Sequence, residues 1–219
     1  MAISVMLDLE TWGKKPGCDL RSIGATVFDP ITGTVGKECR ACNGGRGPGN
    51  VNDGGGEFYV ATDNPRTRID GPPEYPLTRD PGTVQWWSEQ SDEAQAAFAD
   101  PVDLRDALMQ FGGWLRDQAD DCGYQFAIDQ RVPDDVALWS HGPAFDVAIL
   151  AAAYDAVGLP VPWHYRAPRD TRTAFDMAGI DDHSAWLQRY SVGTLHNALD
   201  DAISQARAVC GAYARLHAR

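Results

Sequence analysis

Two carboxylates stand close together near the start of the chain, in the run Asp8-Leu9-Glu10. They close a short apolar segment, Ile3–Asp8, whose length and composition predict a β-strand. Because residues i and i+2 of a strand point to the same face, both carboxylates are expected on one side of the sheet. Two such groups at the end of a buried strand repel each other unless a proton or a cation intervenes, although a solvated strand end would show the same pattern.

A third carboxylate, Asp146, lies at the start of a helix predicted over Phe145–Val157. The helix dipole alone favours an Asp at this position. The dipole does not explain why the preceding strand, predicted over Asp135–Ser140, would carry Asp146 to the edge where the first strand ends. We therefore count Asp146 with the first two carboxylates.

The last group lies at the start of the terminal helix, in the run His196-Asn-Ala-Leu-Asp-Asp201. A rotation of ~100° per residue places Asp200 closer than Asp201 to the helix face of His196. Regular helix geometry thus favours Asp200, unless His196 lies on the loop just before the helix. In that case His196 reaches over the site while Asp201 projects into it from the first turns.

Together these residues predict a site for hard divalent cations, built from Asp8, Glu10, Asp146, Asp201 and His196. Carboxylates suit Mg²⁺ or Mn²⁺, whereas Zn²⁺ favours more His or Cys ligands. Two such ions about 4 Å apart can activate a water and stabilise the leaving oxygen of a phosphodiester. A mobile histidine is the natural general base, because its side chain titrates near neutral pH.

Composition limits the class of protein that can hold such a site. The 219 residues carry a net charge of −12, and 43% of them are hydrophobic, which excludes a disordered chain. No apolar run approaches the ~18 residues of a membrane span, and Met1–Leu7 is too short for a signal peptide, so we expect a cytoplasmic protein without membrane contact. The acidity argues against coating nucleic acid by phosphate neutralisation, but not against nucleic acid as a substrate if metal ions supply positive charge at the site.

The remaining patterns predict one α/β domain over residues 1–219, with a mixed central sheet and helices on both faces. A glycine-rich insertion is expected at about residues 39–56. For the terminal helix, Thr194 is the favoured N-cap and Asn197 the less favoured one. The other expected strands are Ser22–Asp29, Glu57–Ala61 and a short one near Trp163–Arg166. The other expected helices are residues 83–99 (broken near Ser91), Asp103–Asp120 and a terminal helix from about Ser191 or Leu195 to Leu216.

Three motifs resemble those of the DEDDh 3′→5′ exonucleases, which have the ribonuclease H-like fold: DLET at Asp8–Thr11, HGPAFD at His141–Asp146 and HNALDDA at His196–Ala202. Further blocks, QWWSEQS at Gln85–Ser91 and RDTRT at Arg169–Thr173, resemble the phage and prophage exonuclease VIII-like proteins. The same branch includes the mycobacterial-type 3′→5′ exoribonucleases. The resemblance covers nearly the whole chain except the glycine-rich stretch.

The resemblance implies a role for each site residue. Asp8 would bridge two Mg²⁺ or Mn²⁺ ions, Glu10 and Asp201 would complete the site of the ion that holds the attacking water, and Asp146 would serve the second ion. His196 would be the general base, so the family pattern selects Asp201 over Asp200. The implied substrate contacts are Leu9, Thr11 next to the 3′-terminal sugar, Trp87, His141 and Arg172.

The resemblance also implies the reaction, which is hydrolysis of single-stranded or 3′-overhanging DNA or RNA to nucleoside 5′-monophosphates. Trp86 and Trp87 are candidates to stack a terminal base, although one of two adjacent tryptophans on a helix is usually core. His141 is a rival base or phosphate contact, or a turn-packing residue. Two alternatives stay open, a phosphodiesterase on very short oligonucleotides and an idle scaffold that binds nucleic acid or protein. Family members often form homodimers, so a homodimer is a further expectation.

Overall fold

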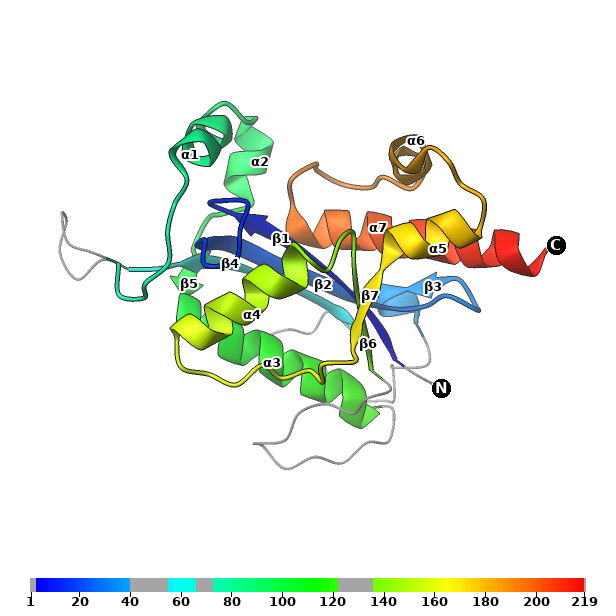
Figure 1. Ribbon diagram of the computed structural model, residues 1–219, viewed down its shortest axis with the longest axis horizontal. Coiled ribbons are helices and arrows are strands. Elements are labelled where there is room, and N and C mark those ends of the chain that lie inside the picture. The colour runs from blue at the N-terminus through cyan, green and yellow to red at the C-terminus, as the bar shows by residue number, and fades with distance from the viewer. Residues whose placement is uncertain (1–2, 40–54, 66–72, 122–135, 219) are drawn as a thin grey trace.

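The computed structural model describes residues 3–39, 55–65, 73–121 and 136–218, and its strands form one sheet in the order β5-β4-β2-β1-β6-β7, with β3 paired to β2 (Figure 1). Strands β1 and β2 are antiparallel, whereas β6 and β7 continue parallel to β1. The strands are β1 (Ser4–Thr11), β2 (Leu20–Asp29), β3 (Thr34–Val35), β4 (Glu57–Asp63), β5 (Val102–Asp103), β6 (Ala137–Ser140) and β7 (Pro168–Asp170).

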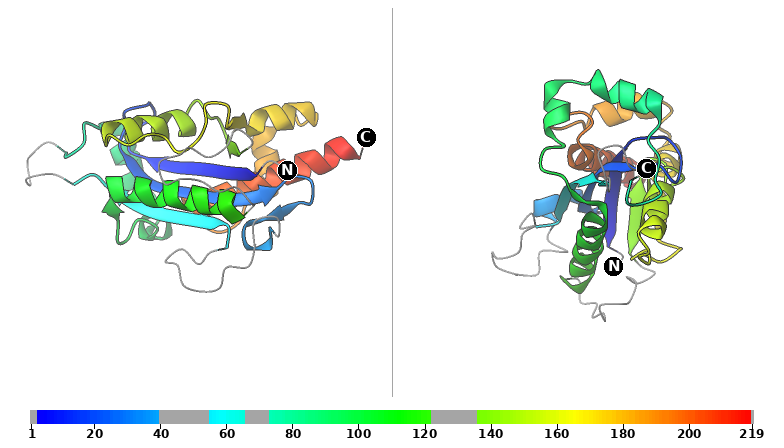
Figure 2. Two further views of the ribbon diagram at one scale, coloured as in Figure 1. Left: turned by 90° about the horizontal axis from the view of Figure 1, so that it is seen from below. Right: turned by 90° about the vertical axis from the view of Figure 1, so that its left-hand side faces the viewer.

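Helices cover both faces of the sheet, as both views in Figure 2 show. On one face, α4 (Asp146–Ala156) packs on β1 and α3 (Leu104–Asp121) packs on β4 and β2, and both helices share a core cluster with Leu7 and Leu9 of β1. On the other face, α5 (Thr171–Met177) and α7 (Ala198–His217) pack on Met6 from β1 and on Trp139. The predicted mixed sheet with helices on both faces is therefore confirmed, and the face that carries Met6 is also the face of Asp8 and Glu10.

Two short helices, α1 (Pro81–Ser88) and α2 (Asp92–Ala96), form a cap beside the end of β1 (Figure 1). The Asp80 side chain accepts a hydrogen bond from Thr83 N–H, and the Ser91 side chain accepts one from Ala94 N–H, so each helix begins at an N-cap. The predicted break near Ser91 is confirmed, because Ser91 is the N-cap at which α2 begins. We call residues 81–98 the cap segment.

The C-terminal half differs from the sequence-based predictions at three points. No strand forms near Trp163–Arg166 in the described chain, because the Trp163 ring packs against Tyr154 in the core, and the strand lies at β7 instead. The segment after it holds α5 and α6 (His183–Gln188), for which the sequence predicts no element because they are too short to show a periodic pattern. The N-cap of α7 is Asn197, which accepts from Leu199 N–H and Asp200 N–H, and not Thr194.

Gly24 sets how closely α7 approaches the sheet. It pairs directly with Asp8 in the β1–β2 register. A Cβ atom at Gly24 would come within 2.1 Å of the Ala198 carbonyl carbon and 2.3 Å of the Leu199 nitrogen. The absent side chain therefore lets the first turn of α7 sit against the strand beside Asp8.

Substituting Gly24→Ala should push the start of α7 off the sheet. We expect a loss of unfolding free energy of ~1–3 kcal/mol or more, because backbone atoms rather than a flexible side chain must move. Urea unfolding measures this loss. The matched control is Gly113→Ala in α3, where an added Cβ meets nothing within 4 Å and helix propensity favours Ala by ~1 kcal/mol. Equal effects of the two substitutions would contradict the close approach.

Candidate active site

The end of β1 carries the first two site carboxylates on the face covered by α7. Glu10 is only 9% exposed, and Asp8 is half-buried. The Asp8 Oδ1 atom accepts a hydrogen bond of 2.7 Å from Gln205 Nε2, a residue four positions beyond Asp201 on α7. The end of β1 and the N-terminal half of α7 are thus in contact beside Asp8.

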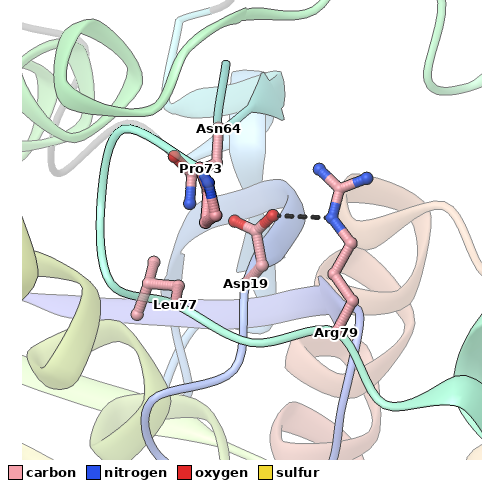
Figure 3. A pocket seen from close by; sticks show the side chains of 5 residues that line it. All are labelled: Asp19, Asn64, Pro73, Leu77 and Arg79. Atoms are coloured by element: carbon pink, nitrogen blue, oxygen red, sulfur yellow. Dashed lines mark hydrogen bonds and ion pairs between the residues drawn. The ribbon is translucent and has the colours of Figure 1, made fainter. Parts of the chain in front are cut away.

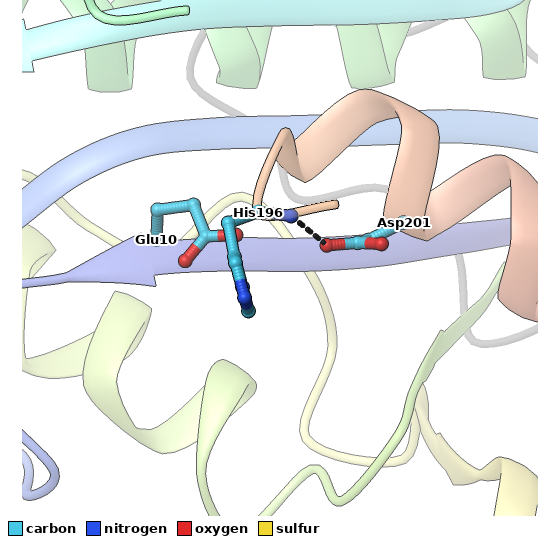
Figure 4. A group of neighbouring side chains, drawn as sticks. All are labelled: Glu10, His196 and Asp201. Carbon is cyan, nitrogen blue, oxygen red and sulfur yellow. Dashed lines mark hydrogen bonds between the residues drawn. The ribbon is translucent and has the colours of Figure 1, made fainter. Parts of the chain in front are cut away.

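His196 lies on the loop immediately before α7, and Asp201 lies in the first turns of the helix (Figure 4). The His196 main chain has φ +65°, a left-handed conformation that non-glycine residues seldom adopt. Its N–H donates a hydrogen bond of 3.1 Å to Asp201 Oδ2. This loop position resolves the helix-rotation argument in favour of Asp201. Asp200 instead accepts a hydrogen bond from Thr194 N–H at 2.8 Å, away from His196.

The side chains of Glu10, His196 and Asp201 form a compact group that could hold a metal ion. One ligand atom from each residue lies within 4.8 Å of the other two. Figure 4 shows Glu10 arriving from the strand and His196 and Asp201 from the loop and helix. The imidazole of His196 packs edge-on against two indoles, with ring centroids 4.9 Å from Trp86 and 6.0 Å from Trp87.

Asp146 completes the acidic group from the other neighbouring strand. It is the first residue of α4, directly after β6 and its following turn, and it is 4% exposed. Arg172, in the first turn of α5, brings a positive charge that offsets part of the rise in the Asp146 pKa caused by burial. The guanidinium lies against Gly142, where a Cβ atom would come within 2.9 Å of Arg172 Nη1, and φ at Gly142 is +112°.

Burial raises the pKa of all four carboxylates, and repulsion by the other site carboxylates adds to the rise for Asp8 and Glu10. For Asp8 the pKa lies well above its ordinary value, because of desolvation first and then repulsion by Asp146, Glu10 and Asp201. Desolvation and the Asp201 charge raise the pKa of Glu10 to about 8. Desolvation raises the pKa of Asp146 to about 7, and it also raises that of Asp201 despite the His196 hydrogen bond. A divalent cation would relieve this repulsion directly.

The predicted substrate residues divide between buried and accessible positions. Leu9 is 5% exposed within the core on the opposite face from Asp8. The Thr11 hydroxyl donates to the Gly13 carbonyl at 2.6 Å. Trp87 is 2% exposed and its indole Nε1 donates to the Thr11 carbonyl at 2.9 Å, whereas Trp86 is 41% exposed. Of the two indoles, Trp86 is the one that a substrate can reach.

His141 is tied into the turn before α4. Its Nδ1 lies 2.7 Å from the Thr171 hydroxyl, and its ring packs near Phe175. Desolvation and the nearby Arg172 charge lower the His141 pKa, which favours the neutral imidazole. These contacts agree with a turn-packing residue, while its part in substrate contact stays a prediction.

Gln205 contacts a carboxylate of the candidate site, and the sequence reasoning missed it. It is 9% exposed and holds Asp8 by the 2.7 Å hydrogen bond, while its Oε1 is buried without a partner among the described residues. The sequence does carry a signal for Gln205, because residues four apart lie on one helix face and Gln205 follows the predicted site residue Asp201 by four positions.

The donor set fits divalent ions that prefer oxygen ligands. Carboxylate oxygens dominate it, with one imidazole at the rim, as Mg²⁺ or Mn²⁺ favours. The unpartnered Gln205 Oε1 is an acceptor with capacity for a further hydrogen bond, such as one from a water in the coordination shell.

The raised pKa values predict how stability depends on pH. In the unfolded chain Glu10 and Asp146 ionise near 4.5 and 3.8, but in the metal-free fold they do so near 8 and 7. Between these limits the folded state binds more protons, so its stability falls as pH rises from about 4.5 to 8. In thermal unfolding, the midpoint temperature should fall by about 2–4 °C for each kcal/mol of unfolding free energy lost. Added Mn²⁺ should raise this midpoint more at pH 8 than at pH 5.

The matched control for this measurement is Glu10→Gln, which removes one titrating group and keeps the side-chain shape. Its midpoint should vary less with pH than that of the wild type. Parallel profiles for the two proteins would contradict the raised Glu10 pKa.

Comparison with known proteins identifies the family to which the chain is similar. The family described as the 3′-5′ exoribonuclease Rv2179c-like domain matches residues 3–212 of the chain. No curated protein gives a significant sequence match. In the part of the chain that is described, no helix is long and apolar enough to cross a membrane.

Solved structures share the fold at low sequence identity. The nuclease domain of 3′hExo, a DEDDh family member bound to rAMP, is 10% identical, and the match covers 96% of this chain and 90% of that one, with a TM-score of 0.54. S. pombe Pop2p in its Mg²⁺- and Mn²⁺-bound form is 13% identical, and the match covers 95% of this chain and 81% of that one, with a TM-score of 0.51.

The zinc-bound E. coli ExoI–ssDNA complex is 15% identical with a TM-score of 0.52, and the match covers 99% of this chain but only 40% of that chain. With the family match over residues 3–212 and this shared architecture, the chain belongs to the Rv2179c-like 3′-5′ exoribonuclease domain family, on the ribonuclease H-like fold of the DEDDh exonucleases.

Proposed function

We propose that this 3′-5′ exonuclease hydrolyses single-stranded or 3′-overhanging RNA to nucleoside 5′-monophosphates, with two Mg²⁺ or Mn²⁺ ions and His196 as general base. The observation that carries the proposal is the meeting of Asp8, Glu10, Asp146 and Asp201 beside one imidazole. The family description supports RNA, and the DNA-bound exonuclease I makes DNA the necessary comparison.

The four carboxylates would hold the ions at the end of β1. Asp8 would contribute to holding both ions, because its charge interacts with each of the other three carboxylates. Glu10 and Asp201 would serve one ion and Asp146 the other. When bound, the ions supply activation of a water and stabilisation of the leaving 3′-oxygen.

His196 would take the proton of the attacking water at its imidazole. The contacts with Trp86 and Trp87 orient the ring, and the loop position leaves it at the rim of the carboxylates. Since the main-chain N–H of His196, rather than its side chain, holds Asp201, the base can be removed without losing that hydrogen bond.

Arg172 would contact a phosphate oxygen near Asp146, since it is a cation that acts on that carboxylate. Trp86 would stack on the terminal base from its exposed position on the cap, a contact worth ~1–3 kcal/mol. With a net charge of −12, the rest of the chain offers little grip on a long duplex, which favours unpaired ends. A cytoplasmic location, one domain and a homodimer remain predictions.

Substituting His196→Asn tests the general base. Asn tolerates the left-handed conformation at this position better than most residues, so the loop should keep its shape. We expect the rate to fall by ~10²–10⁴-fold while Mn²⁺ affinity is largely kept. Single-turnover hydrolysis and calorimetric titration measure the two quantities, and an unchanged rate would remove His196 from the mechanism.

The decisive assay compares 5′-labelled RNA and DNA of one sequence, with Mg²⁺ or Mn²⁺, using Asp8→Asn as the inactive control. A ladder that shortens from the 3′ end, faster on RNA and absent in the control, is the expected result. Cleavage of di- and trinucleotides alone would instead identify a phosphodiesterase on short oligonucleotides. Binding without cleavage of any length would identify an idle scaffold.

A further inference from the structure

Arg21 lies at an irregularity of the β1–β2 pairing, next to the active site. Glu10 pairs with Ser22 and Thr11 pairs with Leu20, so Arg21 is the extra residue of a bulge. Bulges redirect a side chain locally, and they are frequent beside active sites. Here the bulge turns a charged side chain into the interior, where Arg21 is only 8% exposed.

Three aromatic rings surround the Arg21 guanidinium. Its central carbon lies 4.3 Å from the ring centroid of Trp12, 4.2 Å from that of Trp87 and 3.6 Å from that of Phe98. A guanidinium stacks on an aromatic face by cation–π attraction, which strengthens when the contact is buried. We call these three rings the aromatic cage of Arg21.

The polar contacts of Arg21 also reach the cap segment. Nη2 donates to Gln95 Oε1 at 3.2 Å, and Gln95 Nε2 in turn donates to the Trp87 carbonyl. Nη1 is buried without a hydrogen-bond partner among the described residues. The Glu10 charge attracts the guanidinium and offsets part of the cost of its burial, but the unpaired Nη1 still makes the arrangement costly.

Trp87 connects the cage to the general base. One side of its indole faces Arg21, its Nε1 holds the Thr11 carbonyl at the end of β1, and its ring packs on the His196 imidazole. Trp86, which also packs on His196, contacts Trp87 edge-on at 4.9 Å. A shift of Trp87 would therefore also displace Trp86, and both rings that pack on His196 would move.

We propose that Arg21 is a positioning residue of the active site, which locks Trp87 and the cap segment against the end of β1 and thereby orients the imidazole of His196. This inference rests on the proposed role of His196 as general base. It deepens that role, because it names what holds the base in place.

A second arginine shows the contrast. Arg79 also lies over Trp12, at 4.8 Å, but its Nε is paired with the buried Asp19 carboxylate at 2.9 Å, in the pocket of Figure 3. Arg79 thus neutralises a buried charge. Arg21 has its closest ring contacts with Phe98 and Trp87 from the cap segment, which is what a positioning role requires.

Two substitutions test the proposal. Arg21→Met keeps an unbranched apolar stem and removes the planar cation, and Arg21→Lys keeps the charge but cannot stack on three rings. The matched control is Arg189→Met, which removes an exposed arginine that lies over Trp186 at 5.6 Å, on α6. Urea unfolding of each protein separates stability from the readouts below.

The first readout does not depend on activity. The chain has five histidines, so the His196 imidazole signal in a ¹H–¹³C spectrum can be assigned by its loss in His196→Asn. Two adjacent indoles shift that signal by their ring currents. We expect both Arg21 variants to move it toward the position of a free imidazole, while the control leaves it unchanged.

The second readout is the split between kcat and KM on RNA. We expect kcat to fall by about 10–100-fold in Arg21→Met, since a displacement of about 1 Å can cost 10²-fold, with KM changed far less. Arg21→Lys should recover only part of the loss, and Arg189→Met should match the wild type.

An unmoved His196 signal, or a wild-type kcat, in a folded Arg21 variant would overturn the proposal. Loss of folding in both variants would also overturn it, because Arg21 would then act through stability. If the wild-type protein hydrolyses no nucleic acid, the proposed function fails by itself, and the His196 signal still decides whether Arg21 orients the ring.

Discussion

Repulsion among four carboxylates is the constraint on which this structure depends. Asp8, Glu10, Asp146 and Asp201 meet where little water reaches them, and each has a raised pKa whose largest cause is desolvation. A fold gains nothing from such a cluster by itself. The cluster is favourable only when a proton or a cation sits among the oxygens, which links the stability of this region to its function.

The architecture brings the four groups together through three adjacent elements. Strand β1 presents two of them on one face, the turn after the parallel strand β6 delivers the third, and the first turns of α7 deliver the fourth. Two are at helix N-termini, where the dipole offsets part of the repulsion. Gly24 allows α7 to approach, and Gln205 and Arg172 add a hydrogen bond and a positive charge.

Much of this arrangement could be predicted from the sequence, because it follows from local patterns. The strand ending in Asp8 and Glu10, the helix beginning at Asp146 and the break near Ser91 all follow from apolar spacing and capping residues. Local patterns did not decide between Asp200 and Asp201. That choice depends on the left-handed conformation of His196, in which its N–H donates a hydrogen bond to Asp201. Family resemblance supplied what helix geometry could not.

Other features depend on contacts between distant segments. Two adjacent tryptophans on a short helix cannot both face the sheet, but the docking of the cap segment decides that Trp87 is buried and Trp86 is exposed. The bond from Gln205 to Asp8 joins residues 197 positions apart. The Arg21 cage draws on β2, the loop after β1 and the cap segment, so no single stretch of sequence reveals it.

Calorimetric titration of the metal-free protein with Mn²⁺ at pH 7, in buffers of different ionisation enthalpy, tests the central claim most directly. Metal binding to carboxylates with raised pKa must release protons, so the observed heat should vary with the buffer. The account predicts two bound ions with net proton release, largely lost in Asp8→Asn. Absence of binding, or binding with no buffer dependence, would contradict it.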